Sequence, residues 1–180
     1  MTKVTPYNNT ETKKKQITKM FDNIAGSYDF LNHTLSFGMD NVWRKIAIKK
    51  LSNNPAIILD IATGTGDFAI SATKYTNANI TGIDISQGML DVGIKKITKK
   101  GLKDRIHLQL ADSEKLPFKN DSYDAITAGF GVRNFEDLNK GLSEMYRTLK
   151  SGGIVAILEP SEPTYFPLKQ FYKLYFHHIL

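Results

Sequence analysis

Cysteine is absent from the 180 residues of the chain. This absence excludes disulfide bonds, thiolate metal sites and cysteine nucleophiles, and it is typical of a protein in a reducing compartment. With only 13 glycines and 6 prolines, the composition also excludes a fibrous or disordered chain. Residues 2–16 are polar and show no secretory signal, and no apolar run reaches the length of a membrane span. We therefore expect a cytoplasmic protein.

Acidic residues are in the minority: 24 Lys and Arg against 18 Asp and Glu give a net charge of +6. A positive net charge of this size keeps a protein soluble, and it would also favour binding to nucleic acid or to an anionic membrane surface. No aromatic residues are interleaved with the lysines of residues 13–15 and 95–100, as a base-stacking surface requires. We predict no nucleic-acid partner, while a peripheral contact with a membrane surface stays open.

Two apolar patterns divide the chain, which we treat as a single domain. From Gln16 to Leu51 apolar residues recur at helical spacing with a break at residues 26–32, so residues 1–54 are predicted to form an N-terminal helical cap. In residues 55–160 short apolar runs alternate with amphipathic ones, which predicts a doubly wound α/β fold with a mostly parallel sheet and helices on both faces. The expected strands are 57–62, 79–84, 105–111, 123–129 and 154–159, and the expected helices are 67–75, 87–100 and 135–150.

Residues 161–180 end in an apolar, aromatic stretch that runs from Phe171 to Leu180. A domain rarely ends on such a surface without something that covers it. We expect this segment to be the start of a shortened C-terminal part, or a contact in a homo-oligomer.

Gly64 and Gly66, with Thr65 between them, follow an expected strand and open an expected helix. Glycine lets the backbone turn sharply and approach a ligand, and the free N–H groups of a first helical turn favour polar or anionic groups. Alone, these glycines fit a tight turn that binds nothing. They also fit a dinucleotide, because Gly64-x-Gly66-x-x-Ala69 matches the relaxed fingerprint and Asp84 lies 18 residues after Gly66.

Four aspartates favour S-adenosylmethionine over a dinucleotide. Asp60 and Asp67 flank the loop, where their charge would repel a pyrophosphate and attract a sulfonium and an amino group. Asp84 ends the second strand, where it can accept both ribose hydroxyls, and Asp112 follows the third, where it can reach the adenine edge. Either residue alone fits a helix cap or a turn. The predicted cofactor ligands are Gly64, Thr65, Gly66, Asp84, Asp112 and Ser113, and we predict no metal.

Three blocks of the chain carry a more specific pattern. They contain Tyr28-Asp29-Phe30-Leu31-Asn32 with Trp43-Arg44, Asp60 to Asp67 with Gly82-Ile83-Asp84-Ile85-Ser86, and Phe130-Gly131-Val132-Arg133-Asn134. With these blocks the sequence resembles the ubiquinone/menaquinone biosynthesis C-methyltransferase family, within the class I S-adenosylmethionine-dependent methyltransferases. The chain departs from the family pattern at Asp40, where histidine is usual, at Ser151, where proline is usual, and at Gly129, where serine is frequent.

The resemblance implies methylation of a ring carbon of a polyprenylated quinol, such as demethylmenaquinol, in menaquinone or ubiquinone biosynthesis. It also implies a longer chain, with further C-terminal strands and a lid that are missing here. Ionisation of a quinol hydroxyl makes the ring carbon more nucleophilic, and Arg133 is our candidate for stabilising that charge, with a surface ion pair as its alternative role. Tyr28 and Asn32 are expected in the wall over the cofactor.

Three other functions stay open at this point. A nicotinamide-dependent oxidoreductase would need neither the acidic pair beside the glycines nor Asp112. A non-catalytic, cofactor-binding accessory subunit would fit the abrupt C-terminal end. A methyltransferase with another small-molecule acceptor is also compatible with the pattern, because a fold does not fix its substrate.

Overall fold

The computed structural model describes residues 6–7, 10–161, 164–165 and 170. Most of residues 161–180 therefore lies outside the described residues. The expectation that this segment begins a shortened C-terminal part with missing strands stays an expectation.

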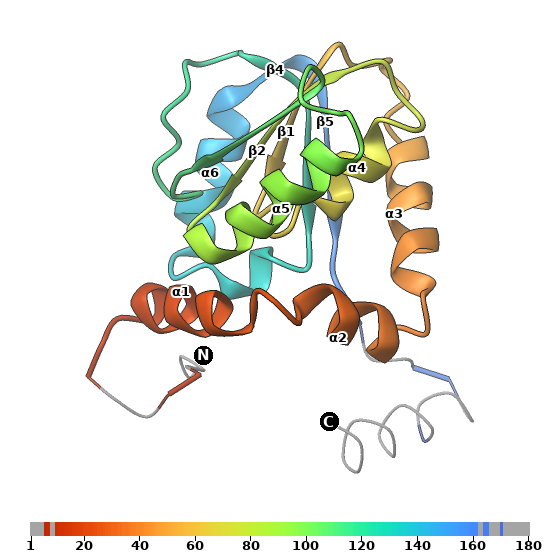
Figure 1. Cartoon of the computed structure of the whole chain (residues 1–180). Helices are drawn as coiled ribbons and strands as arrows, with labels where there is room; N and C mark the ends of the chain where they lie inside the picture. Colours follow the sequence, from red (N-terminus) through yellow and green to blue (C-terminus); the bar gives the residue numbers. More distant parts are fainter. Residues whose placement is uncertain (1–5, 8–9, 162–163, 166–169, 171–180) are drawn as a thin grey trace.

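One parallel sheet of five strands, in the order β3-β2-β1-β4-β5, forms the centre of the molecule (Figure 1). β1 pairs with β2 on one side and with β4 on the other, so the crossovers that leave this point run in opposite directions. Such a switch point opens a crevice at the carboxyl ends of the strands. The doubly wound α/β fold predicted from the sequence is confirmed. The strands are β1 (Ile57–Ile61), β2 (Asn79–Asp84), β3 (Ile106–Leu110), β4 (Tyr123–Gly129) and β5 (Leu149–Leu158).

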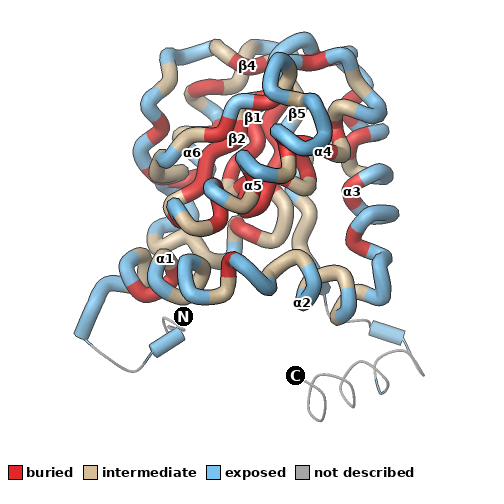
Figure 2. Tube along the Cα trace, viewed as in Figure 1, coloured by how far each residue is buried: buried red, intermediate tan, exposed pale blue. Residues whose placement is uncertain are grey.

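Helices cover both faces of the sheet. Successive strand residues such as Ile58 and Leu59 point to opposite faces, and each face has its own apolar core. Ile48 of α3 belongs to the first core and Met145 of α6 to the second. Figure 2 shows that burial is concentrated in the central strands between these helices. The helices are α3 (Met39–Lys49), α4 (Asp67–Ala72) and α5 (Gln87–Lys99) on the first face and α6 (Leu138–Thr148) on the second.

Two further helices, α1 (Lys13–Ile24) and α2 (Tyr28–Leu35), run beneath the sheet in the view of Figure 1. Asp22 fixes α1 to the start of α5, because its Oδ1 accepts hydrogen bonds from the Ser86 hydroxyl at 2.6 Å and from the Gly88 N–H at 3.0 Å. Ser86 also caps α5 by accepting a hydrogen bond from the Met89 N–H at 3.2 Å. The N-terminal helices thus lie against the end of the sheet where the expected site is.

α2 corrects the sequence interpretation, which placed a break at residues 26–32. The break spans only residues 25–27, because α1 ends at Ile24 and α2 begins at Tyr28. α2 is short, and the Gly26-Ser27 pair that precedes it makes its start resemble a loop in the sequence. α6 also begins later than expected, at Leu138 after the N-cap Asp137, and residues 149–150 belong to β5 instead of the helix.

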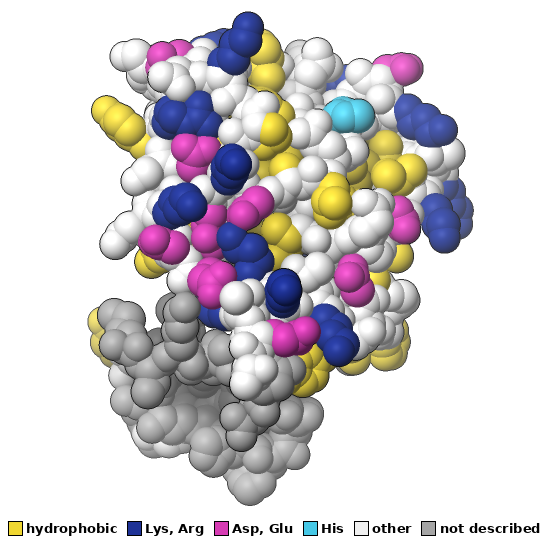
Figure 3. Space-filling view, turned by 90° about the vertical axis from the view of Figure 1, so that its left-hand side faces the viewer, with side chains coloured by type: hydrophobic (Ala, Val, Ile, Leu, Met, Phe, Trp, Pro, Cys, Tyr) yellow, Lys and Arg dark blue, Asp and Glu magenta, His cyan; other side chains and the backbone are white. Residues whose placement is uncertain are grey.

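The surface in Figure 3 carries both charges. Lys and Arg side chains alternate with Asp and Glu across this face of the molecule, so it presents no patch of a single sign. Among the described residues no helix combines the length and apolar character that crossing a membrane requires.

Candidate functional site

An open cleft of about 660 Å³ lies at the carboxyl ends of the strands. The segments after β1, β2 and β3 line it together with Phe21 of α1 and Tyr28 of α2. The cleft therefore forms where the N-terminal helices cross the switch point of the sheet. Four predicted cofactor ligands line it: Gly64, Asp84, Asp112 and Ser113.

A second cavity of about 350 Å³ adjoins the first and contains Thr65 in its lining. Ala62 and Phe130 line both cavities, and each holds a left-handed backbone, with φ of 52° and 60°. Non-glycine residues in this region are strained, and such strain is concentrated at functional sites. The junction of the two cavities is thus the most unusual backbone environment of the cleft. Tyr28, Ala62, Gly64, Gly129 and Phe130 line both cavities.

The two glycines of the loop have different roles. Gly64 has a φ of +56° and donates its N–H to Asp84 Oδ2 at 2.8 Å, and a Cβ there would make a tight contact of 3.1 Å with Met89 Cε. Gly66, with a φ of +81°, lines neither cavity in the described structure, and a Cβ there would face Ile97 and Leu108 of the core. Gly64 therefore shapes the ligand surface, while Gly66 shapes the turn that starts α4.

Asp84 holds the loop through both of its carboxylate oxygens. Oδ2 accepts from the Gly64 N–H at 2.8 Å and Oδ1 accepts from the Ser86 N–H at 2.9 Å. Burial raises the pKa of Asp84, and these backbone hydrogen bonds partly oppose the shift. The carboxylate keeps acceptor capacity for a hydroxyl of a ligand, so the ribose-binding role of Asp84 stays a prediction.

Asp112 forms a cluster that the sequence did not reveal. Lys14 Nζ donates to Asp112 Oδ2 at 2.7 Å and to Glu114 Oε2 at 3.0 Å, and Asp112 Oδ1 accepts from the Glu114 N–H at 2.9 Å. All three side chains line the cleft. The only sequence signal was the lysine run of residues 13–15, which looks like a solvent-exposed segment until α1 is placed against the sheet.

Asp60 and Asp67, which flank the glycine loop, both have partners within the protein. Asp60 is fully buried and accepts hydrogen bonds from the hydroxyls of Thr63 and Thr127, both at 2.6 Å. Burial raises its pKa to about 6, against the effect of these two hydrogen bonds. Asp67 forms an ion pair with Lys96. Its charge is therefore balanced within the protein.

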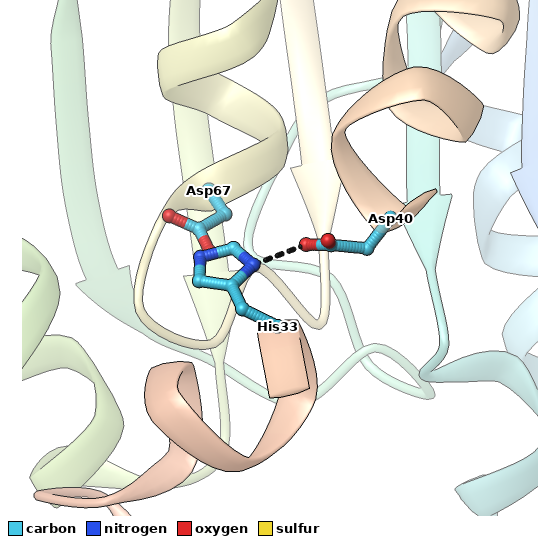
Figure 4. Close-up of side chains that lie close together, drawn as sticks. All are labelled: His33, Asp40 and Asp67. Carbon is cyan, nitrogen blue, oxygen red and sulfur yellow. Dashed lines mark ion pairs between the residues drawn. The ribbon is translucent and has the colours of Figure 1, made fainter. Parts of the chain in front are cut away.

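His33, Asp40 and Asp67 lie close together between α2, α3 and the glycine loop (Figure 4). His33 Nδ1 is 2.7 Å from Asp40 Oδ2, and its Nε2 is 3.6 Å from Asp67 Oδ2. Each residue has a ligand-type atom within 4.8 Å of the others, but Asp40 is paired with Arg44 and Asp67 with Lys96. A metal ion would have to displace these cations, so the absence of a metal stays our prediction.

Arg133 lies in the short 3-10 helix η1 (Val132–Asn134), and its side chain is 54% exposed. Its Nη1 is 2.9 Å from Glu159 Oε2, and it lines neither of the two described cavities. This is the surface ion pair that the sequence left open. The neighbouring Asn134 does line the cleft, so a change of the Arg133 rotamer is needed to bring the guanidinium to a bound acceptor.

The chemistry of the lining fits S-adenosylmethionine. Asp84, Asp112 and Glu114 offer acceptors for hydroxyl and amino groups, whereas a pyrophosphate would meet these carboxylates unfavourably. Lys14 is the single cation among the described residues that line the larger cleft, and it is already paired with two carboxylates. Together the fold and this lining define a class I S-adenosylmethionine-dependent methyltransferase.

Comparison with known proteins specifies the family. A model of the ubiE/COQ5 methyltransferase family matches residues 9–180, and the chain belongs to this family. The demethylmenaquinone methyltransferase of Bacteroides fragilis is 51% identical over 175 residues, which cover 96% of this chain and 71% of the relative. The ubiquinone/menaquinone biosynthesis C-methyltransferase of Geotalea daltonii is 48% identical over 171 residues, with coverage of 93% and 73%. The resemblance stated from the sequence is thus confirmed.

Solved structures support the fold. The [4+2]-cyclase SpnF has a TM-score of 0.70 at 21% identity, and the match covers 83% of this chain and 60% of SpnF. A putative S-adenosylmethionine-dependent methyltransferase of Methanococcus maripaludis has a TM-score of 0.68 at 23% identity, with coverage of 98% and 77%. The chain is an S-adenosylmethionine-dependent methyltransferase, and the nicotinamide-dependent alternative is set aside.

Proposed function

We propose that the chain methylates a ring carbon of demethylmenaquinol, a polyprenylated quinol, with S-adenosylmethionine as the methyl donor. The observation that carries this proposal is the 51% identity, over 96% of the chain, to a relative named demethylmenaquinone methyltransferase. A prenylated benzoquinol is the second candidate, because the Geotalea relative is named for both ubiquinone and menaquinone biosynthesis.

The places of the predicted residues in the two cavities support the following proposed cofactor contacts. Asp84 accepts the ribose hydroxyls, Asp112 and Ser113 bind the adenine edge, and Gly64 with Thr65 lies against the remainder of the cofactor. Gly66 acts only through the shape of the turn. When bound, S-adenosylmethionine supplies a methyl group on a positively charged sulfur, which is an electrophile.

The protein must hold the acceptor ring in place and favour the ionised form of its hydroxyl. Tyr28 and Phe130 line both cavities and place aromatic rings at their junction, where the acceptor ring can pack. Burial raises the pKa of Tyr28 against the opposing charges of Arg44 and Arg133, so its phenol stays protonated at neutral pH and can donate a hydrogen bond. Arg133 stabilises the quinol oxyanion after it leaves Glu159.

A peripheral contact with the membrane belongs to this proposal, because a polyprenylated quinol is dissolved in the bilayer. The expected cytoplasmic location, with a contact on the inner face of the membrane, follows from the same argument. A homo-oligomer stays a prediction, which sedimentation of the purified chain tests.

The acceptor is tested by offering the protein demethylmenaquinol and a benzoquinol with the same prenyl chain, at equal concentrations with labelled S-adenosylmethionine. We expect the label mainly in the naphthoquinol. Preferential labelling of the benzoquinol assigns the second candidate. A protein that binds S-adenosylmethionine and labels neither ring is an accessory subunit, contrary to the proposal.

Asp84→Ala is expected to weaken S-adenosylmethionine binding by about 1–3 kcal/mol, through loss of charge-assisted hydrogen bonds to the ribose and of the acceptor for the Gly64 N–H. Titration calorimetry measures the change. Asp91→Asn, at an exposed position of α5, is the control and should leave the affinity unchanged. Equal affinities of Asp84→Ala and the wild type would remove Asp84 from the site.

Arg133→Met is expected to lower kcat by about 10- to 100-fold, the worth of one charge-assisted hydrogen bond, with an unchanged dissociation constant for S-adenosylmethionine. Glu159→Gln breaks the same surface ion pair but keeps the guanidinium. If Arg133 acts on the acceptor, kcat falls in the first variant and not in the second. Equal effects of both variants would show that only the ion pair matters.

A further inference from the structure

Helix α3 carries apolar residues on the side that faces away from the core. Its inner side buries Asp40, Arg44 and Ile48. Four large apolar residues follow the opposite side at positions i, i+3, i+4 and i+7, and a surface helix of a globular protein normally turns such a stripe inward. We name it the outer stripe; its members and exposed fractions are Met39 (45%), Val42 (44%), Trp43 (36%) and Ile46 (53%).

The turn that precedes α3 extends this apolar surface. Phe37 is two residues before Met39, has a φ of +51°, and is 80% exposed. A bulky residue with positive φ is strained, and here the strain is not offset by burial of the ring. Phe37 therefore adds a largely exposed aromatic side chain just before the outer stripe.

The exposed charges on α3 are all positive. Its exposed charged residues are Lys45 and Lys49, followed by the C-cap Lys50. Asp40, the single acidic residue of the helix, is fully buried. A helix that exposes large apolar side chains beside lysines has the chemistry that binds an anionic lipid surface.

The outer stripe is connected to the functional site through two aromatic rings. The Trp43 ring lies edge-on to the Phe130 ring, with centroids 6.3 Å apart. Phe130 lines both cavities, and the Arg44 guanidinium lies 5.9 Å from its ring centroid. An apolar surface therefore continues from the outside of α3 to the place where the two cavities meet.

We propose that Phe37 and the outer stripe of α3 dock the protein on an anionic phospholipid bilayer. In this position the prenyl tail of the acceptor passes along Trp43 and Phe130 while its ring enters the cleft. The role of the tail rests on the proposed function, whereas the docking surface rests on exposure, charge and continuity with the site. A second copy of the chain, or residues of the chain beyond those described, are the competing occupants of this surface.

Trp43 is the single tryptophan of the chain and lies within the outer stripe, so its fluorescence reports on this surface directly. The full chain is mixed with vesicles of phosphatidylglycerol, of phosphatidylcholine, and of phosphatidylglycerol with brominated acyl chains. We expect a blue shift with phosphatidylglycerol, quenching by the brominated lipid, and at least tenfold weaker partitioning into phosphatidylcholine. Added salt should weaken binding to the anionic vesicles.

Ile46→Asp is expected to reduce partitioning into phosphatidylglycerol vesicles at least tenfold, and because this side chain is 53% exposed the variant should fold. Tyr146→Asp is the matched control, since it places the same charge at an 84% exposed aromatic position of α6. This control should bind vesicles as the wild type does. Circular dichroism of both variants verifies that they are folded.

Three results would overturn the inference. One is Trp43 emission that does not respond to anionic vesicles; another is equal loss of binding in both variants. The third is a dimer that Ile46→Asp dissociates, which assigns the stripe to a second copy. The vesicle assay uses neither cofactor nor quinol, so its failure is separate from that of the proposed function. Methylation of a water-soluble, short-chain quinol without vesicle binding would refute only the docking surface.

Discussion

Arg44→Met is expected to lower the free energy of unfolding by about 3–5 kcal/mol, because it leaves a buried carboxylate without its cation. Asp40 is 0% exposed and Arg44 is 4% exposed, and their side chains form an ion pair one turn apart on α3. Burial raises the pKa of Asp40, but the hydrogen bonds from Arg44 and Ser36 outweigh it, so the pKa is lowered overall. Urea unfolding followed by circular dichroism at neutral pH measures the loss.

Two variants separate the buried pair from a general effect of removing a positive charge. Lys45→Met removes a neighbouring exposed cation and should change stability by less than about 1 kcal/mol. The double variant Asp40→Leu with Arg44→Met replaces both charges by apolar groups and should recover most of the loss. If Arg44→Met unfolds at the same urea concentration as the wild type, the pair does not stabilise the cap.

Asp60→Asn is expected to remove a pH-dependent part of the free energy of unfolding worth about 3 kcal/mol. This amount corresponds to the difference between the folded pKa of Asp60, about 6, and its ordinary pKa of 3.8. Protonated Asp60 favours folding. This contribution is fully present below pH 3.8 and is lost as the pH rises through 6. The asparagine variant does not titrate, so its stability does not fall in this range, and the difference in free energy of unfolding between variant and wild type shifts in its favour between pH 4 and pH 8. Urea titrations at several pH values measure this shift.

Asp124→Asn is the control with the opposite sign. The hydrogen bond from Lys150 lowers the pKa of Asp124, so ionisation of this residue favours folding. Relative to its asparagine variant, the wild type should therefore gain stability as the pH rises through the range where Asp124 titrates. A difference between the wild type and Asp60→Asn that does not vary with pH would contradict the assignment of Asp60 as a buried, mostly desolvated acid.

The sequence predicted the sheet because its strands are buried on both faces. Ile58, Leu59 and Ile126 are fully buried, and runs of this kind separate clearly from the amphipathic helices between them. α2 was missed because Gly26 and Ser27 before it read as the start of a longer loop, although Tyr28, Leu31 and Leu35 recur at helical spacing. The start of β5 at Leu149 was assigned to the preceding helix, because the helix ends where the strand begins and no turn signal stands between them.

In the functional site, the residues that the strand ends and the glycine loop place there could be predicted from the sequence. The residues that reach the site from distant helices could not. Gly64 and Asp84 lie at the ends of neighbouring strands, where a parallel sheet places them together. Lys14 reaches the cleft only because α1 crosses the sheet, 98 positions away from its partner Asp112 in sequence. The ion pair of Asp67 with Lys96 likewise depends on how α5 packs against the loop, so sequence spacing could not reveal this partner.

The cleft at Gly64 and Asp84 is proposed to deliver the methyl group of S-adenosylmethionine to a quinol ring. Incubation of the full chain with methyl-labelled S-adenosylmethionine and demethylmenaquinol tests it most directly. The account predicts that the label appears on a ring carbon of the quinol, and that Asp84→Ala at limiting cofactor transfers less of it. A folded protein that leaves the quinol unlabelled, or that binds NADH more tightly than S-adenosylmethionine, would contradict the account.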